Sequence, residues 1–255
     1  MQKNVEVKSP AEIATMRAGG AIVADILVLL TGQVRAGMTT GDIDAVCREE
    51  LKKRGAKPAF LNYHGFPGVI CVSINSEVVH GIPSKERALK DGDIVGLDFG
   101  CVVDGWFADS ARTVPVGAIT PEAQKLITVT RESLEKGIEQ IKAGCRLGDI
   151  GWAVQSHAQS HGYSLVREFV GHGIGRALHE EPAVPNYGKP GHGLRLKAGM
   201  TIAIEPMVNM GGPEVATLSD GWTAVTKDGK LSAHFEHTVA VTETGFDILT
   251  LPSKA

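Results

Sequence analysis

Four acidic residues stand in segments that otherwise have the composition of a protein core. Asp98 and Glu205 each end an apolar run. Asp109 and Glu236 lie inside two further segments of the same kind. An unpaired buried carboxylate costs several kcal/mol, so each acid must be protonated, paired with a base or bound to a metal ion. Arg112 is the only lysine or arginine interleaved in these segments, which favours divalent cations as the neutralising charge.

Three histidines extend this candidate metal site. His172 lies between Gly171 and Gly173 on an apolar run, where the glycines permit a close approach of backbone and metal. His179 follows seven residues later and is placed to donate a hydrogen bond, and His80 lies at a strand-to-turn junction. Because four carboxylates exceed the charge of one divalent ion, two ions about 3.5–4 Å apart fit better. Oxygen-rich ligation indicates Mn, Fe, Co, Zn or Mg rather than copper, and a histidine ligand shifts that balance toward the transition metals.

An internal repeat predicts how these residues come together. A shift of 107 positions aligns residues 89–98 with residues 196–205, so that Asp98 falls on Glu205. Two similar halves of a single domain are therefore expected. The predicted halves are residues 1–118 and 119–255.

The repeat also predicts which acids face each other. If the two halves pack about a pseudo-dyad, corresponding strands approach corresponding strands. Asp98 then faces Glu205, and Asp109 faces Glu236. Like charges this close repel strongly, so the arrangement requires cations between them.

Each half is predicted to consist of helices followed by strands. Ser9, Pro10 and Glu12 form a capping box that opens the first helix. Thr120 and Pro121 open its counterpart in the second half. The predicted helices are residues 10–30, 41–54, 120–141 and 148–161, with Gly37 and Gly144 as helix stops.

Two Asp-Gly pairs predict tight hairpins among the strands of each half. Asp104-Gly105 separates residues 102–103 from residues 106–107, and Asp228-Gly229 separates Val225 from Leu231. The order of helices first and strands afterwards favours an α+β layered fold over the alternation of a Rossmann-type fold.

Composition excludes several other classes of protein. The chain has 255 residues, of which 43% are hydrophobic and 22% charged, as in an ordinary folded protein. A net charge of −3 provides no basic surplus for nucleic acid or an anionic membrane. The longest apolar stretch, residues 21–30, is about half of the ~20 residues a membrane helix needs, which indicates a buried helix. The N-terminal residues show no export signal, so we expect a cytoplasmic protein.

Taken together, the motifs resemble the type I methionine aminopeptidases, which belong to peptidase family M24A within the pita-bread metallopeptidase superfamily. The resemblance spans nearly the whole chain. It implies an internally duplicated α+β fold, in which a strongly curved antiparallel sheet has helices outside and two metal ions on its concave face. The motifs that carry it are Tyr63-His64-Gly65, Val79-His80-Gly81-Ile82-Pro83, Asp98, Asp109, Gly171-His172-Gly173-Ile174-Gly175, His179-Glu180-Glu181-Pro182, Ile204-Glu205-Pro206 and Glu236-His237-Thr238.

The resemblance also implies a role for each site residue. A water activated by two ions, drawn from Co, Mn, Fe or Zn, attacks the first peptide carbonyl. Glu205 is the general base, His179 stabilises the oxyanion, and His80 contacts the region of the scissile nitrogen. The implied ligands are Asp98 on one ion, His172 and Glu205 on the other, and Asp109 and Glu236 as bridges.

The implied substrate is a nascent polypeptide or peptide with an N-terminal methionine and a small second residue. Asn75 and Ser232 are candidates for a structural monovalent cation or for a turn. We expect a monomer, with the ribosome as a candidate partner. Cys71 is interpreted as a small apolar wall rather than a nucleophile. The residues expected to line the methionine pocket are Phe60, Tyr63, Phe66, Cys71, Leu178 and Trp222.

Three alternatives share parts of this pattern. A proline-directed aminopeptidase or prolidase shares the ligands, but such enzymes usually carry a long additional N-terminal domain. A binding protein without catalysis on the same fold would be expected to have lost ligands, and none is missing. A type II enzyme would need a sizeable insertion between His172 and Glu205, and that interval is too short.

Overall fold

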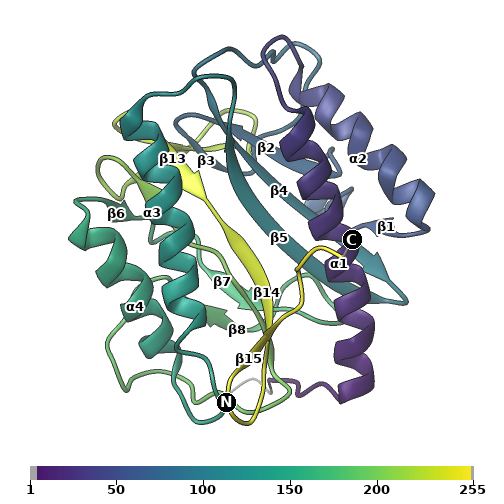
Figure 1. Ribbon diagram of the computed structural model, residues 1–255, viewed down its shortest axis with the longest axis vertical. Coiled ribbons are helices and arrows are strands. Elements are labelled where there is room, and N and C mark those ends of the chain that lie inside the picture. The colour runs from purple at the N-terminus through teal and green to yellow at the C-terminus, as the bar shows by residue number, and fades with distance from the viewer. Residues whose placement is uncertain (1–4, 254–255) are drawn as a thin grey trace.

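The computed structural model describes residues 5–253 as a curved sheet with helices across one face (Figure 1). The four helices of this part of the chain are α1 (Pro10–Gln33), α2 (Thr40–Arg54), α3 (Pro121–Ile138) and α4 (Leu147–Ser160). Helices α1 and α2 cover one part of the sheet, and α3 and α4 cover the other. A single 3₁₀ turn, Tyr63–Gly65, lies between α2 and the next long strands.

The central sheet has nine strands, in the order β1-β4-β5-β14-β9-β7-β8, with β2 added beside β4 and β15 beside β14. All its pairings are antiparallel. Its strands are β1 (Lys57–Pro58), β2 (Ile70–Ile74), β4 (Ile94–Val103), β5 (Trp106–Pro115), β7 (Gly171–Gly173), β8 (Glu180–Val184), β9 (Thr201–Ile204), β14 (Glu236–Val241) and β15 (Phe246–Ile248).

Two three-stranded sheets flank the central one, in the orders β13-β10-β6 and β11-β12-β3. Their strands are β3 (Glu77–Val79), β6 (Ser164–Leu165), β10 (Met207–Asn209), β11 (Val215–Thr217), β12 (Ala224–Thr226) and β13 (Ser232–His234).

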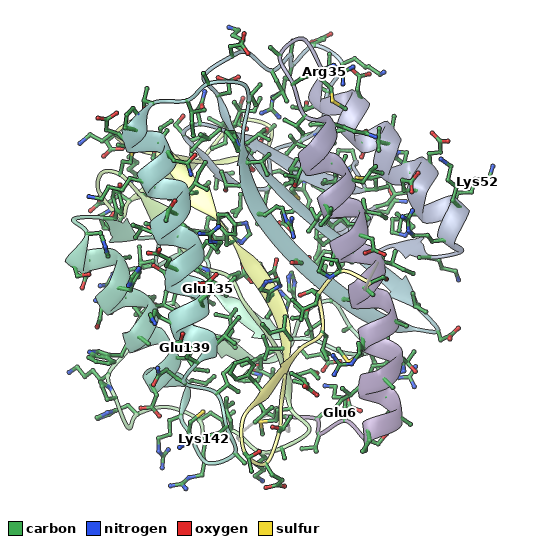
Figure 2. The ribbon with its side chains drawn as sticks, in the orientation of Figure 1. Glu6, Arg35, Lys52, Glu135, Glu139 and Lys142 are labelled. Atoms are coloured by element: carbon green, nitrogen blue, oxygen red, sulfur yellow. The ribbon has the colours of Figure 1, made fainter. Side chains whose placement is uncertain are left out.

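The helices begin where the capping residues predict. Ser9 accepts from the backbone N–H of Glu12, whose carboxylate accepts in return from the Ser9 backbone, so the expected capping box opens α1. Thr120 caps α3 in the same way from the backbone N–H of Ala123. Charged side chains lie on the outward surface of the helices, as Figure 2 shows for Lys52 on α2 and Glu135 on α3.

Helix α1 is long and apolar enough to cross a membrane by length and composition. In the structure it packs against β4 and β5, and Met16, Ile26 and Leu30 are fully buried there. The core helix of a folded domain passes the same test of length and composition. The interpretation of residues 21–30 as a buried helix is therefore confirmed.

Each half of the chain builds its own apolar core beneath its helices. Leu27 of α1 packs in one cluster with Leu97 and Phe99 of β4. Ile150 of α4 packs in a second cluster with Ile202 of β9. Both clusters fill the space between helices and sheet, which leaves the opposite face of the sheet free for a site.

The shift of 107 positions recurs in the contacts of the structure. The backbone N–H of Gly37 donates to Leu89, and 107 positions later that of Gly144 donates to Leu196, both at 2.9 Å. An isolated bridge joins Thr39 to Ala88, and its counterpart joins Arg146 to Arg195. The internal duplication thus fixes the same turn and the same second helix in both halves, while the division at residues 118 and 119 stays a prediction.

Two sequence predictions about helix ends and turns are wrong. Helix α1 continues past the predicted end at residue 30 to Gln33, and α3 ends at Ile138, before the predicted end at residue 141, so neither glycine stops its helix. Gly37 and Gly144 instead occupy the turns that follow, with φ of 82° and 95°, a conformation that glycine adopts without strain. Each helix therefore ends before the chain reaches its glycine.

The second expected hairpin is also wrong, whereas the first is confirmed. Val103 pairs with Trp106 across the Asp104-Gly105 turn. At Asp228-Gly229 the chain does turn, but β12 pairs with β3 and β11, and β13 pairs with β10. The carboxylate of Asp228 accepts from the backbone of Gly212, which ties this turn to a distant loop and separates the two strands.

Candidate metal centre and active site

The strand register places Asp109 and Glu236 side by side on one face of the sheet. Glu236 begins β14 and pairs with Ala111 of β5. Asp109 lies two residues before Ala111, so its side chain projects from the same face, because side chains alternate along a strand. Asp98 of β4 also pairs with Ala111, from the other side of β5. The expected approach of Asp109 to Glu236 is what the register brings about.

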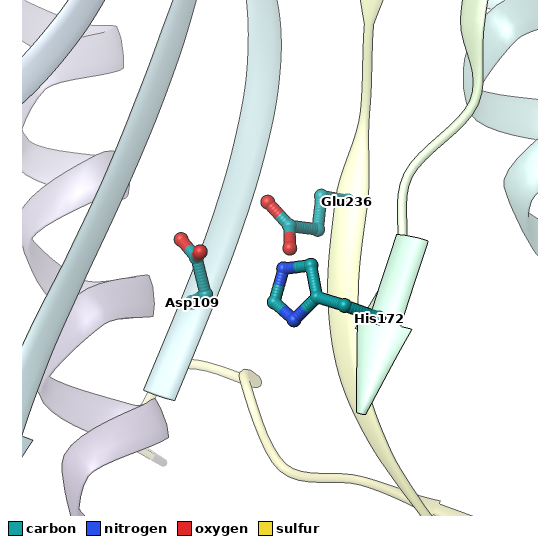
Figure 3. A group of neighbouring side chains, drawn as sticks. All are labelled: Asp109, His172 and Glu236. Carbon is teal, nitrogen blue, oxygen red and sulfur yellow. The ribbon is translucent and has the colours of Figure 1, made fainter. Parts of the chain in front are cut away.

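The other half of the cluster comes from β7 and the end of β9. His172 is the central residue of β7, and Glu205 directly follows Ile204, the last residue of β9. His172 Nε2 lies 3.5 Å from a carboxylate oxygen of Glu205. Candidate ligand atoms of Asp109, His172 and Glu236 all lie within 4.8 Å of one another, and Figure 3 shows the three side chains converging from three strands.

The acids of this cluster are so deeply buried that their negatively charged forms are disfavoured. Burial, with a smaller effect from neighbouring charges, raises the pKa of Asp98, Glu205 and Glu236 well above the usual values. Burial likewise raises the pKa of Asp109 to about 7. The space between them therefore favours whatever brings positive charge, either protons or cations.

Unsatisfied oxygen atoms show that this space suits a metal. Asp98 Oδ1, Asp109 Oδ1 and Glu236 Oε1 are buried and have no hydrogen-bond partner among residues 5–253. Buried oxygens of this kind are otherwise nearly always satisfied. A set of carboxylate oxygens with one imidazole is also the donor chemistry of divalent transition metals. The residues present thus fit divalent ions.

His172 has the protonation state that a ligand requires. Its Nδ1 lies 2.9 Å from the carbonyl oxygen of Gly173, which can only accept, so Nδ1 carries the proton. Burial lowers the pKa of His172 to about 3, and the ring is neutral at pH 7. The lone pair of Nε2 therefore faces the carboxylates, as in histidine ligands held by a backbone carbonyl.

An apolar cavity of about 240 Å³ opens beside the carboxylates. All six residues expected to form the side-chain pocket line it, together with His64 and His80. The rings of Phe66 and Trp222 meet edge to face with centroids 5.1 Å apart. The six residues brought together are Phe60, Tyr63, Phe66, Cys71, Leu178 and Trp222.

Cys71 has the character of a wall rather than of a nucleophile. It is buried on β2, where its Cα pairs with that of Asp98. Burial and then the Asp98 charge raise the pKa of the Cys71 thiol well above its usual value. The thiol stays protonated at neutral pH, and only a thiolate would be a strong nucleophile.

The two remaining histidines border the cluster as neutral rings. Burial lowers the pKa of His80 to about 4 and also lowers that of His179. The ring of His179 packs against that of His172 at a centroid distance of 4.2 Å. The hydroxyl of Tyr63 lies 2.8 Å from His179 Nδ1.

His234 is a neighbour of the cluster that sequence reasoning left without a role. It is 3% exposed, and its Nε2 lies 3.8 Å from Glu205 Oε2 with no hydrogen-bond partner in the described part of the chain. Its position two residues before Glu236 was the available indication, since alternate residues of an extended segment share a face. His64 was also passed over and lines the cavity.

Asn75 has the contacts of a turn residue. Its φ is 57°, and its backbone carbonyl accepts from the N–H of Ser232 at 2.9 Å. Its side chain donates to Asp93 and accepts from the backbone of Ile94. These contacts fit the turn role, one of the two roles expected for Asn75. Its other expected role, binding a monovalent cation with Ser232, stays a prediction.

Comparison with known proteins identifies the family of this chain. The model of metallopeptidase family M24 matches residues 14–243. The chain belongs to metallopeptidase family M24. Among curated members, methionine aminopeptidase 1 of Bacillus subtilis is 52% identical over 243 residues, which cover 95% of this chain and 98% of that protein.

Solved structures agree with the M24 assignment. The crystal structure of methionine aminopeptidase from Rickettsia prowazekii superposes with a TM-score of 0.96 at 44% identity, covering 97% of this chain and all of that one. The prolidase of Pyrococcus horikoshii, at 23% identity and a TM-score of 0.77, shares the fold, and 64% of its chain is covered. The expected α+β pita-bread fold and the resemblance to M24 enzymes are thereby confirmed.

Proposed function

We propose that this M24 metallopeptidase is a methionine aminopeptidase, which hydrolyses the first peptide bond of chains with an N-terminal methionine and a small second residue. The observation that carries the proposal is an aromatic and apolar cavity opening directly onto the carboxylate cluster. An unbranched thioether side chain suits such a cavity, because sulfur packs favourably against aromatic rings. The names of full-length relatives support the same activity.

Five residues would hold two divalent ions in this proposal. Asp98 would bind one ion, His172 and Glu205 the other, and Asp109 and Glu236 both. When bound, the ions supply acidity to a water molecule, whose pKa falls to about 7, and offset negative charge on the substrate carbonyl oxygen. The orphaned oxygens of Asp98, Asp109 and Glu236 support this set.

Glu205 is the residue best placed to move the proton. Glu205 lies 3.5 Å from His172 and lines both the cavity and the adjoining cleft, which would put its carboxylate beside the scissile bond. It would accept a proton from the attacking water and deliver it to the departing amine nitrogen. His80, which borders both the cavity and the adjoining cleft, would contact the region of that nitrogen.

His179 would donate a hydrogen bond to the carbonyl oxygen as it becomes negative. The Tyr63 hydroxyl can donate to Nδ1 of His179, which leaves the single proton of the neutral ring on Nε2. A well-placed donor of this kind is typically worth about 2.7–4 kcal/mol of transition-state stabilisation.

The rest of the substrate chain would lie in a second cleft that adjoins the cluster. This cleft, of about 510 Å³, shares Asp98, His172 and Glu205 with the methionine cavity. Placing the first side chain in one space and the remaining chain in the other puts the scissile bond over the carboxylates. The proposal includes nascent polypeptides as substrates, a cytoplasmic setting, a monomeric enzyme and the ribosome as a candidate partner.

A peptide assay on metal-stripped protein tests the proposal. Chelated enzyme would be supplied in turn with Mn, Fe, Co and Zn, and hydrolysis of Met-Ala-Ser, Met-Lys-Ser and Ala-Pro-Ser would be compared. We expect metal-dependent cleavage of Met-Ala-Ser alone. Preference for Ala-Pro-Ser would favour the proline-directed alternative, and metal uptake without hydrolysis of any peptide would favour a binding protein.

A further inference from the structure

An ion pair behind the active site joins the segment before α1 to strand β8. The side chain of Lys8 is 2% exposed, and its Nζ lies 2.5 Å from Glu180 Oε2. The Lys8 backbone N–H donates to Gly199 at 2.8 Å, which holds the segment in place. A lysine this deeply buried requires a partner for its charge, and Glu180 supplies a directly bonded one.

The same carboxylate fastens the loop that connects β7 to β8. Glu180 Oε1 accepts from the backbone N–H groups of Arg176 and Ala177, at 2.6 and 3.1 Å. A Cβ atom on Gly175 would lie 2.5 Å from Lys8 Cε and 2.7 Å from Glu180 Oε1. The loop therefore packs directly on the Lys8–Glu180 pair, and a larger residue at position 175 would push these two side chains aside.

This loop carries two side chains of the substrate cavity at its far end. Leu178 is 3% exposed and forms part of the cavity wall, and His179 directly precedes Glu180. The near end is held by the main chain, since Ile174 donates to Thr201 and Gly175 accepts from Phe107. The far half has the Glu180 carboxylate as its anchor, with Tyr63 contacting the His179 ring.

We propose that Lys8 is a positioning residue, which acts through Glu180 to hold the 174–179 loop so that His179 and Leu178 face the substrate. Without the ammonium group, the part-buried Glu180 carboxylate would lose its ion-pair partner and would turn toward water, releasing the N–H groups of Arg176 and Ala177. The inference rests on the proposed role of His179 in stabilising the carbonyl oxygen.

A double-mutant cycle tests whether Lys8 acts through His179. Lys8→Met would be made in the native chain and in His179→Ala, and kcat and KM for Met-Ala-Ser would be measured on metal-loaded enzyme. Outright removal of one hydrogen-bond donor to the developing oxyanion typically costs about 10²–10³-fold in kcat, and a misplaced donor costs part of that. We expect a fall in kcat of about 10-fold in the native background and little further loss in His179→Ala, because the contacts belong to one pathway.

Three companion measurements separate positioning from general stability. Lys8→Arg should recover most of the lost kcat, and the metal content of Lys8→Met should equal that of the native protein. Glu180→Gln should reproduce the kcat loss, which covers the case in which Lys8→Met does not fold. Arg17→Met, which removes the exposed Arg17–Asp247 pair on the same side of the molecule, is the matched control and should leave kcat unchanged.

Any of four results would overturn the inference. An equal fold loss from Lys8→Met in both backgrounds would show a structural role that does not pass through His179, and a native kcat in both Lys8→Met and Glu180→Gln would show that the ion pair has no role in turnover. A native kcat in His179→Ala would refute the proposed role of His179 and this inference with it. A lowered kcat in His179→Ala together with a native kcat in Lys8→Met would refute this inference but not the proposed role of His179.

Discussion

The hydroxyl of Tyr63 and the Nδ1 atom of His179 lie 2.8 Å apart, although the two residues are separated by 116 positions in the chain. Tyr63 belongs to the 3₁₀ turn after α2, whereas His179 comes from the loop between β7 and β8. This contact joins the wall of the side-chain cavity to the proposed oxyanion donor. When the hydroxyl donates to Nδ1, the single proton of the neutral ring stands on Nε2, as the proposed oxyanion donor requires.

Tyr63→Phe should therefore lower kcat for Met-Ala-Ser by several-fold while the peptide still binds. The phenylalanine ring preserves the cavity wall, but the His179 tautomer is no longer held by a hydroxyl. Steady-state kinetics give the test, with Tyr63→Ala as the comparison that also removes the wall. A rise in KM with unchanged kcat for Tyr63→Phe would contradict the proposed role.

Asp109→Asn and Glu236→Gln should each abolish measurable activity and weaken metal uptake. Both acids are buried and contribute orphaned oxygens to the cluster, so an amide removes charge at the point where cations are needed. His179→Ala should instead lower kcat with the metals retained. Metal content and calorimetric titration check both statements, and equal metal loss in all three variants would argue against the division of roles.

The stability of the metal-free protein should fall as pH rises from about 4 to 7. The pKa of Asp109 is raised by burial to about 7, so the folded state binds its proton more tightly than the unfolded state does. The resulting stabilisation is complete below the unfolded pKa and is lost as pH passes through the folded one.

Urea unfolding of chelated protein at several pH values measures this dependence. Asp98, Glu205 and Glu236 also have raised pKa values and act in the same direction. Asp109→Asn removes one of these four groups and should make the profile shallower, and a saturating divalent metal should flatten it at neutral pH by replacing protons. An Asp109→Asn profile as steep as that of the native protein would show that other groups carry the effect.

His234 should support Glu205. Its Nε2 lies 3.8 Å from a Glu205 oxygen, and burial lowers the pKa of His234 to about 3, so the ring is neutral. His234→Leu removes a polar neighbour and should weaken metal affinity by about 10-fold or more, as is typical for groups around metal ligands. His234→Gln keeps a donor and should lose less. Equal calorimetric affinity in native protein and His234→Leu would contradict the expectation.

The residues of the site were largely predictable because their chemistry is unusual for their surroundings. An acid such as Asp98 at the end of an apolar run is conspicuous, and the repeat identifies Glu205 as its counterpart in the second half. The histidine flanked by Gly171 and Gly173 is conspicuous for the same reason. Local sequence also fixed the helix starts, since a capping box is complete within four residues.

What the sequence did not reveal depends on partners far away in the chain. A lysine just before a capping box is ordinarily exposed, and the burial of Lys8 follows from Glu180, 172 positions later. Strands β12 and β13 flank a good turn, but each finds a better partner elsewhere. The spacing of His234 to Glu236 indicates only a shared face, and its contact with Glu205 depends on the pairing of β10 with β13.

The pairing of β5 with β14 has a mechanical consequence. Within the central sheet, this junction joins the strands of the first half to those of the second, through Ala111 with Glu236 and Ser110 with His237. The mutually repelling carboxylates straddle that seam. Cations bound there would link the strands of the two halves across this pairing. A change that weakens metal binding would therefore also weaken the contact between the two halves.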